Sequence, residues 1–232
     1  MGTPMALLNK LGQVLTTEIT ADFIFNRKNQ AELSESAHIQ QIKQRKSVQK
    51  LGKKLPHEPA YLIELIQSAV KSSPSVINSQ TTRIVILLEK AHADFWNLVK
   101  EIQRTQVPEQ FFSAIEHKID QSLAAYGTVL FFEDQSILQN LQKNLAINAE
   151  QLPSWSAHSA GMAQYAVWTA LADEGIGAHF NYYNPAIDYR VSQHLQINPH
   201  WKLQTQMVFG SIEQVIENTT MLPNEAEFMV LS

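Results

Sequence analysis

The spacing of apolar residues predicts three amphipathic helices in the first half of the chain. Between Pro59 and Lys71, apolar side chains recur at positions i, i+3, i+4 and i+7, and the same spacing runs through 92–102 and 108–127. This period gathers the apolar side chains into one stripe along each helix, which must be buried against a core. Gly127 closes the third stretch and is expected to end that helix.

Short runs of β-branched, aliphatic and aromatic residues predict the strands between the helices. Arg83–Leu88 and Thr128–Phe132 are apolar almost throughout, which is typical of strands buried on both faces. Ala178–Tyr183 is a third candidate strand. From Trp201 to Gly210, apolar residues alternate with Lys and Gln, and this period of two predicts a strand with one polar face.

The stretch 159–177 predicts a helix of a different kind, because it is apolar on nearly every side. Such a helix belongs in the middle of a structure rather than at its surface. A turn that leads into a further helix is expected over 184–195. Helices and strands in this order indicate an α+β domain built on one sheet.

A change in polarity near residue 40 divides the chain. Residues 1–40 are polar and only weakly periodic, so we interpret them as an N-terminal extension that is partly helical. The main domain is expected to span 41–232 and to begin near the basic run Lys43–Lys54. A chain of 232 residues suits one good-sized domain of this kind.

Composition narrows the classes of function. Hydrophobic residues make up 44% of the chain and charged residues 17%, so a buried subunit interface is favoured. The formal net charge of −4 gives no electrostatic reason to expect nucleic acid or an acidic membrane surface as a partner. No apolar run reaches about 18 residues, so no membrane-spanning helix is expected. The lack of cysteine excludes disulfides and thiolate catalysis, and it fits a cytoplasmic protein.

Familiar catalytic and metal motifs are missing from the sequence. The chain contains no GxGxxG, GxxxxGK[ST], HExxH or GxSxG pattern, and its eight histidines follow no metal-ligand spacing. We therefore expect no metal site and no protein nucleophile. Two other features remain as candidates for binding chemistry.

The first feature is a basic cluster without any acidic residue. Such a cluster is a good anion site, most simply for a phosphate. Taken alone, a solvated basic surface is the simpler interpretation. The cluster consists of Lys43, Arg45, Lys46, Lys50, Lys53 and Lys54.

The second feature is the loop "SSPSVINSQ", residues 72–80, between a predicted helix and a predicted strand. Ser73, Ser75, Asn78 and Gln80 could together contact a flat, polar ligand. The Asn78 amide offers a donor and an acceptor, which matches the imide edge of a flavin ring. Taken alone, a plain helix-to-strand turn is again the simpler interpretation.

Taken together, these segments resemble the flavin-dependent nitroreductase superfamily. Within it, the chain is similar to the branch of the fungal fatty-acid-repression nitroreductases and the copper-induced nitroreductase of lactic acid bacteria. The resemblance covers about residues 43–210, and its most specific part is "WSAHSAGMAQYAVWTALADEGIG". It implies a nitroreductase-like α+β fold, in which helices flank a central, antiparallel-rich sheet. It also implies an intertwined homodimer with two FMN sites at the subunit interface.

The resemblance also implies which residues contact FMN. Arg45 and Ser47, helped by Lys46, would hold the phosphate, while the loop would reach the flavin of the other subunit. The segment Asn181–Pro185 would bring backbone groups near the reactive N5 edge. The implied cofactor-binding set is Arg45, Lys46, Ser47, Pro74, Ser75, Asn78, Gln80 and Asn184.

The chemistry implied by the resemblance belongs to the cofactor. FMN would take a hydride from NADH or NADPH and pass electrons to a small-molecule acceptor, nitroaromatic or quinone-like, in a ping-pong mechanism. A weakly catalytic or regulatory flavin-binding protein of stress or lipid signalling is the alternative. One departure favours that alternative: no basic residue follows Lys202, whereas superfamily members usually carry Lys or Arg there. The phosphate would then rest on Arg45–Ser47 alone, although the intact "RKS" and loop segments favour the enzyme.

Overall fold

The computed structural model describes residues 36–144 and 149–214, together with Met229 and Leu231. The chain divides into two compact units, Met1–Gln40 and Gln41–Ser232. The expected N-terminal extension lies almost entirely outside the described residues, as does most of the C-terminal tail. Helix α2, Ala37–Gln44, is the first described element.

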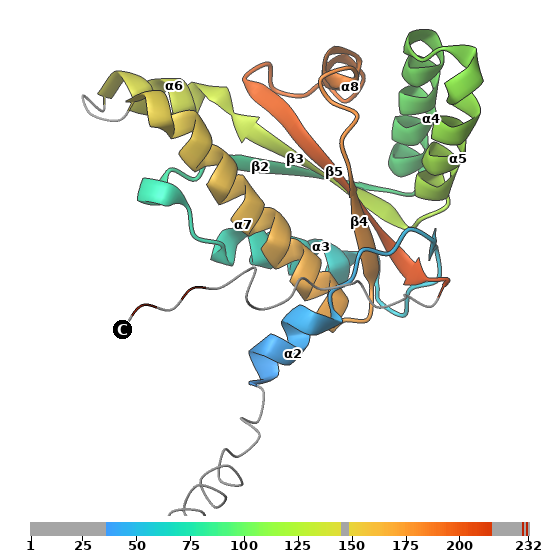
Figure 1. Ribbon diagram of the computed structural model, residues 1–232, viewed down its shortest axis with the longest axis horizontal. Helices are drawn as coiled ribbons and strands as arrows, with labels where there is room; N and C mark the ends of the chain where they lie inside the picture. Colours follow the sequence, from blue (N-terminus) through green and yellow to red (C-terminus); the bar gives the residue numbers. More distant parts are fainter. Residues whose placement is uncertain (1–35, 145–148, 215–228, 230, 232) are drawn as a thin grey trace, which may run out of the picture. The chain divides into compact units, whose positions relative to one another are not determined.

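One five-stranded sheet forms the centre of the described part of the second unit (Figure 1). Its ladders are all antiparallel, in the order β1-β5-β3-β2, with β4 also paired to β5. The expected α+β fold with a central, antiparallel-rich sheet is therefore confirmed. The strands are β1 (Leu51–Gly52), β2 (Thr82–Leu88), β3 (Gly127–Asp134), β4 (Gly177–Asn181) and β5 (Trp201–Ile212).

Helices cover both faces of this sheet (Figure 1). Helices α4, α5 and α8 pack over one apolar core, and α3 and α7 pack over the other. The short helix α6 follows β3 and contacts α7. Their bounds are α3 (Pro59–Ser72), α4 (Glu89–Gln106), α5 (Glu109–Leu123), α6 (Gln135–Asn144), α7 (Leu152–Asp173) and α8 (Asp188–His194).

Strand β3 lies between the two cores and is buried along its whole length. Leu130 and Phe132 enter the core beneath α4, whereas Val129 and Phe131 enter the core beneath α7. This alternation follows from the opposite directions of successive side chains in a strand. It explains why the middle of β3, residues 129–132, is continuously apolar.

Gly127 does not end a helix as predicted. Helix α5 ends at Leu123, and Gly127 is the first residue of β3. A Cβ atom at this position would lie 2.7 Å from the side chains of Leu88 and Phe209. The position therefore requires glycine for close packing between strands, and not for a helix cap.

Helix α7 begins earlier and ends earlier than predicted, at Leu152 and Asp173. Gly175, with a φ of +71°, reverses the chain after it, and the Ile176 N–H donates to the Leu171 carbonyl over 2.9 Å. This is the usual use of glycine just past a helix end. The helix is not buried on every side within one chain, since Met162 and Tyr165 are 36% and 39% exposed.

The predicted polar face of β5 is wrong at Gln206. Lys202 is exposed, but Gln206 is fully buried beside the segment that follows β4. Its side chain accepts from the Tyr183 N–H over 3.0 Å and donates to Asn184 Oδ1 over 3.3 Å. These bonds offset the cost of burying an amide, and they fix the segment that the sequence placed near the flavin.

Candidate functional site

The loop between α3 and β2 has an unusual backbone. Ile77, Asn78 and Gln80 have φ values of 53°, 54° and 48°, in the left-handed region that asparagine tolerates and β-branched residues avoid. Backbone strain of this kind persists only when the surroundings impose it. A simple turn does not need three such residues. The contacts around this loop must therefore impose its shape.

Hydrogen bonds hold the loop in that shape. The Val76 N–H donates to Ser159 Oγ of α7 over 2.9 Å, and the Gln80 N–H donates to Ser75 Oγ over 3.1 Å. Gln80 Nε2 donates to Asn78 Oδ1 over 2.8 Å. Among the described residues nothing accepts from Asn78 Nδ2, so this exposed amide keeps donors for a ligand.

The loop lines a cavity of about 280 Å³. Two cations that the sequence analysis did not select, Lys71 and Arg83, also line it. Arg83 is held in place, since its NH1 donates to the Gln80 carbonyl over 2.8 Å and its NH2 lies 3.2 Å from Asp134 Oδ2. The predicted site residues in the lining are Pro74, Ser75, Asn78 and Gln80, with Ser73 beside them.

The predicted phosphate segment lies elsewhere, beside β4. Ser47 forms a parallel bridge with Ala178. The Arg45 guanidinium lies 4.3 Å from the ring centre of Trp168 and 6.0 Å from that of Tyr165, both on α7. A contact of this kind with an aromatic face holds a guanidinium in place. Its terminal N–H groups can still donate in the plane of the guanidinium.

Arg45 retains hydrogen-bonding capacity that the described part of the chain does not use. Its Nε is buried and has no partner among the described residues. A buried, unpaired donor is costly unless a ligand or another group completes it. Lys46 is half-buried beside it, and Ser47 is exposed.

Asn184 belongs to a third segment, which continues from β4. Its Oδ1 accepts from the buried Gln206, and Asn181 Nδ2 donates to Ser122 Oγ over 3.3 Å. Tyr182, between them, is 67% exposed. Sequence reasoning missed Gln206 as the residue that positions this segment, because its alternation with Lys202 and Gln204 placed it on a polar face.

The structure thus brings the four loop residues together, whereas Arg45, Lys46, Ser47 and Asn184 line no part of the loop cavity within one chain. Helix α7 connects two of these regions. The loop bonds to Ser159 and Arg45 stacks on Trp168, which lies about 14 Å farther along the helix at 1.5 Å per residue.

A buried polar network on the opposite face of the sheet is unrelated to these segments. The Trp96 indole N–H donates to Thr128 Oγ1 over 2.9 Å, and His92 Nδ1 lies 2.9 Å from the same oxygen. His92 Nε2 lies 3.3 Å from the Leu123 carbonyl, which can only accept, so Nε2 carries the proton and Nδ1 accepts from Thr128. Burial lowers the pKa of His92 to about 4, so the ring is neutral near pH 7.

A comparison with protein families identifies the family of this chain. The nitroreductase family model matches residues 42–211, and the chain belongs to that family. The putative nitroreductase HBN1 of Saccharomyces cerevisiae is 28% identical over 195 residues, which cover 83% of this chain and 96% of that protein.

Solved structures give the same result. Nitroreductase CinD from Lactococcus lactis, in complex with chloramphenicol, is 36% identical with a TM-score of 0.77, over 84% of this chain and all of that one. A putative nitroreductase from Desulfovibrio desulfuricans in complex with FMN is 16% identical with a TM-score of 0.62, over 86% of this chain and 99% of that one, and shows the shared fold. Within 36–144 and 149–214, no helix combines the length and apolar character that a membrane crossing needs.

Proposed function

We propose that the protein is a homodimeric, FMN-dependent NAD(P)H oxidoreductase that reduces nitroaromatic or quinone-like acceptors. The observation that carries the proposal is the arrangement on α7. A preformed polar loop bonds to one part of this helix, and an arginine with an unused buried donor stacks on another part. Membership of the nitroreductase family supports the class of reaction.

The residues present fit FMN. Arg45 offers a buried, unpaired Nε and a guanidinium fixed by Trp168, which suit a phosphate. Asn78 keeps free amide donors at the rim of a cavity large enough for the edge of a flat ring. Lys71 and Arg83 add positive charge to that rim, which suits the extra electrons of a reduced flavin.

Bound FMN would supply hydride and electron transfer between NAD(P)H and the acceptor. The chain's own residues would bind and orient the ring. The left-handed loop backbone and its bond to Ser159 hold Asn78 in one position, and Gln206 holds the backbone of Tyr183 and the side chain of Asn184. No acid or base from the protein is needed in this proposal.

In the proposed homodimer, the exposed side of α7 forms the interface. His158, Gly161, Met162 and Tyr165 are exposed at the spacing of one helical stripe. Suppose two copies of α7 cross antiparallel with Met162 on the two-fold axis. Ser159 then lies level with Tyr165 of the partner subunit, because each is three residues from the axis. The loop of one chain would thus face the partner's phosphate segment, as a shared FMN site requires.

The acceptor class is supported by two solved complexes of CinD, one with chloramphenicol and one with 4-nitrophenol. These ligands belong to that protein. We extend only their chemistry, a small nitroaromatic acceptor, to this chain.

Absorbance spectroscopy tests the proposal. The purified protein, incubated with FMN and desalted, should retain a flavin spectrum that NADH or NADPH bleaches and a nitroaromatic compound restores. Bound flavin that neither nucleotide bleaches would support the regulatory alternative. Failure to retain flavin at all would contradict both functions.

A further inference from the structure

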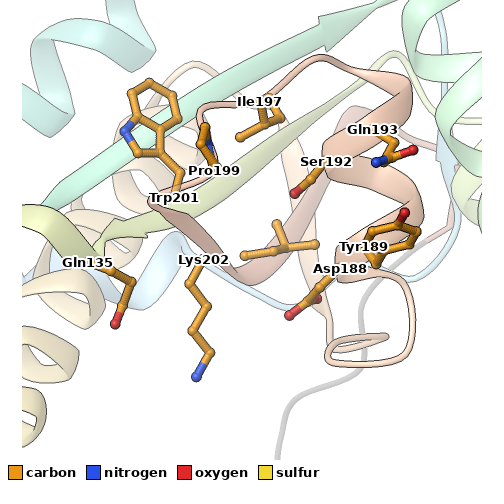
Figure 2. Close-up of a pocket in the computed structure, with 10 residues that line it drawn as sticks. Gln135, Asp188, Tyr189, Ser192, Gln193, Ile197, Pro199, Trp201 and Lys202 are labelled. Carbon is orange, nitrogen blue, oxygen red and sulfur yellow. The ribbon is translucent and has the colours of Figure 1, made fainter.

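A second cavity, of about 430 Å³, lies between α8 and the beginning of β5 (Figure 2). Trp201 and Ile197 supply apolar wall, and Asp188, Ser192 and Lys202 supply polar groups. None of the predicted FMN-binding residues lines it. The family resemblance assigns no role to any of these residues, so the cavity has no explanation in the proposed flavin chemistry.

Asp188 is the unusual group in this cavity. Its Oδ1 is shielded from solvent and has no hydrogen-bond partner among the described residues. Burial raises the pKa of Asp188, while the nearby charge of Lys202 lowers it by a smaller amount. A partly buried carboxylate without a hydrogen-bond donor is costly, so a cation that donates to its other oxygen, Oδ2, would offset part of that cost.

The walls of the cavity are held in place by backbone hydrogen bonds. The Ile197 N–H donates to the Ser192 carbonyl over 2.9 Å, and the Trp201 N–H donates to the Asn198 carbonyl over 2.9 Å. The Gln135 N–H donates to the His200 carbonyl over 2.8 Å and ties this turn to the end of β3. The cavity is thus preformed, which lowers the ordering cost of binding a small ligand.

The side chains divide the cavity by chemistry. In Figure 2 the Trp201 ring and the Lys202 side chain leave the strand in opposite directions, and the Asp188 carboxylate lies at the start of α8. Trp201 also packs against Phe132, with ring centres 6.1 Å apart, so its ring is fixed as part of the wall. A ligand here meets an aromatic wall on one side and an unpaired carboxylate on the other.

We propose that this cavity binds a small organic cation, with its flat apolar body against Trp201 and its charged N–H group on Asp188. An aryl amidinium suits this site, because its charged N–H groups lie in the plane of an apolar ring and can donate to the oxygen of Asp188 that is not shielded, Oδ2. This cavity shares no lining residue with the loop cavity, but Arg83, which lines the loop cavity, lies 6.0 Å from the centre of the Trp201 ring. The proposal does not depend on FMN binding.

Calorimetric titration of the full-length protein tests this, with and without FMN, using benzamidine as the probe and benzamide as a neutral compound of the same shape. We expect benzamidine to bind at least about tenfold more tightly than benzamide, the fold-change of one charge-assisted contact. Asp188→Asn should weaken benzamidine binding about tenfold or more. Lys202→Gln should tighten it by about twofold, since it removes a neighbouring positive charge.

Two controls keep the outcome decisive. Glu64→Gln removes one exposed carboxylate from α3, on the other face of the sheet, and should leave binding unchanged. Ser192→Phe fills the cavity without changing its charge and should abolish binding even if Asp188→Asn fails to fold. Fluorine NMR of fluorotryptophan-labelled protein should show a change at Trp201. Equal affinity for benzamide, no loss in Asp188→Asn, or a change confined to Trp168 would each overturn the proposal.

Discussion

The two faces of the sheet are covered in different ways. On the face of α4, α5 and α8, the buried polar groups His92, Trp96 and Thr128 satisfy one another within the chain. On the face of α3 and α7, the outer side of α7 exposes Met162 and Tyr165, and the same helix contacts both predicted FMN-binding segments. Beneath α4 and α5, the polar groups of the first face are satisfied within the chain, and its cavity lies apart from them, at α8. The second face leaves apolar surface and unpaired donors on and beside α7.

The sequences of the covering helices explain this difference. Helix α4 has one apolar stripe, so a single core can bury all of its apolar side chains. Helix α7 is apolar on most sides, and the core beneath it occupies only its inner residues, among them Val167 and Leu171. A helix of this kind needs a second surface to cover it, which the proposed dimer supplies.

The largest effect should come from Gly161→Glu, which tests whether the exposed side of α7 is a dimer interface. Gly161 is exposed, and a Cβ atom there meets nothing within 4 Å, so the single chain accommodates a side chain. Glutamate also favours a helix more than glycine does, by about 0.5–1 kcal/mol. In the dimer, however, two like charges would face each other near the axis, at a cost of several kcal/mol.

Light scattering of Gly161→Glu should therefore find a folded monomer near 26.2 kDa, whereas the unaltered protein should be a dimer. Gly161→Ala is the matched control and should raise the melting temperature without dissociating the dimer. A Gly161→Glu protein that remains dimeric would show that this side of α7 is not the interface.

The next prediction concerns the face of α4, α5 and α8 and is tested by changing the pH. The pKa of His92 is about 4 in the folded protein, below its ordinary value of 6.5, so the unfolded chain binds more protons between these two values. The free energy of unfolding should therefore fall as the pH falls from 6.5 to 4, by up to about 3 kcal/mol from this group.

Urea unfolding at several pH values measures this dependence. Burial also lowers the pKa of His179, which adds a contribution of the same sign. His92→Gln cannot titrate, so the difference in slope between the two proteins isolates His92. Equal slopes would mean that His92 is not buried as described.

Arg45→Ala tests the proposed phosphate contact beside α7. Losing a charge-assisted phosphate contact should cost about 1.5–3 kcal/mol, or roughly ten- to a hundredfold in FMN affinity. Fluorescence titration of FMN measures this loss, and Lys54→Ala, which removes an exposed charge from the same basic cluster, is the control. FMN affinity that is unaltered in Arg45→Ala would remove this residue from the site.

Asn78→Ala should have the smallest effect of the series. The loss of its amide should weaken FMN binding by about 1–2 kcal/mol and leave the fold intact. Thermal melts with and without saturating FMN separate this from a structural role, because a bound ligand raises the melting temperature by mass action. If Asn78 serves only its own loop, the variant loses stability without FMN and keeps the full FMN-induced shift.

Hydrophobic periodicity predicted much of the fold, because burial of one side of a helix leaves a regular apolar spacing in the sequence. The helical spacing of 59–71 and the apolar run of 83–88 correspond to α3 and β2 within two residues. Gly127 was misassigned, since close packing between strands depends on partners distant in sequence. The same reason hid the burial of Gln206, whose partners lie more than twenty residues away.

The candidate site was less predictable than the fold. Composition pointed to the loop and to the basic cluster, and the family resemblance pointed to Arg45 within that cluster. Neither pointed to Lys71 or Arg83, which join the loop only through the α3–β2 geometry. The left-handed backbone at Ile77 was also hidden, because isoleucine rarely adopts it. The proposed shared site would depend on a second chain, and the helix and strand periodicity of one sequence does not encode where that chain lies.

Mixing two defective proteins tests the central claim, that Arg45 and Asn78 serve one FMN from different chains. Arg45→Ala and Asn78→Ala would be unfolded together in equal amounts, refolded and titrated with FMN. In a shared site, each mixed dimer contains one site without either residue and one intact site, so about a quarter of all sites should recover full affinity. If both residues act on the flavin of their own chain, every site carries one defect, and no recovery will be seen.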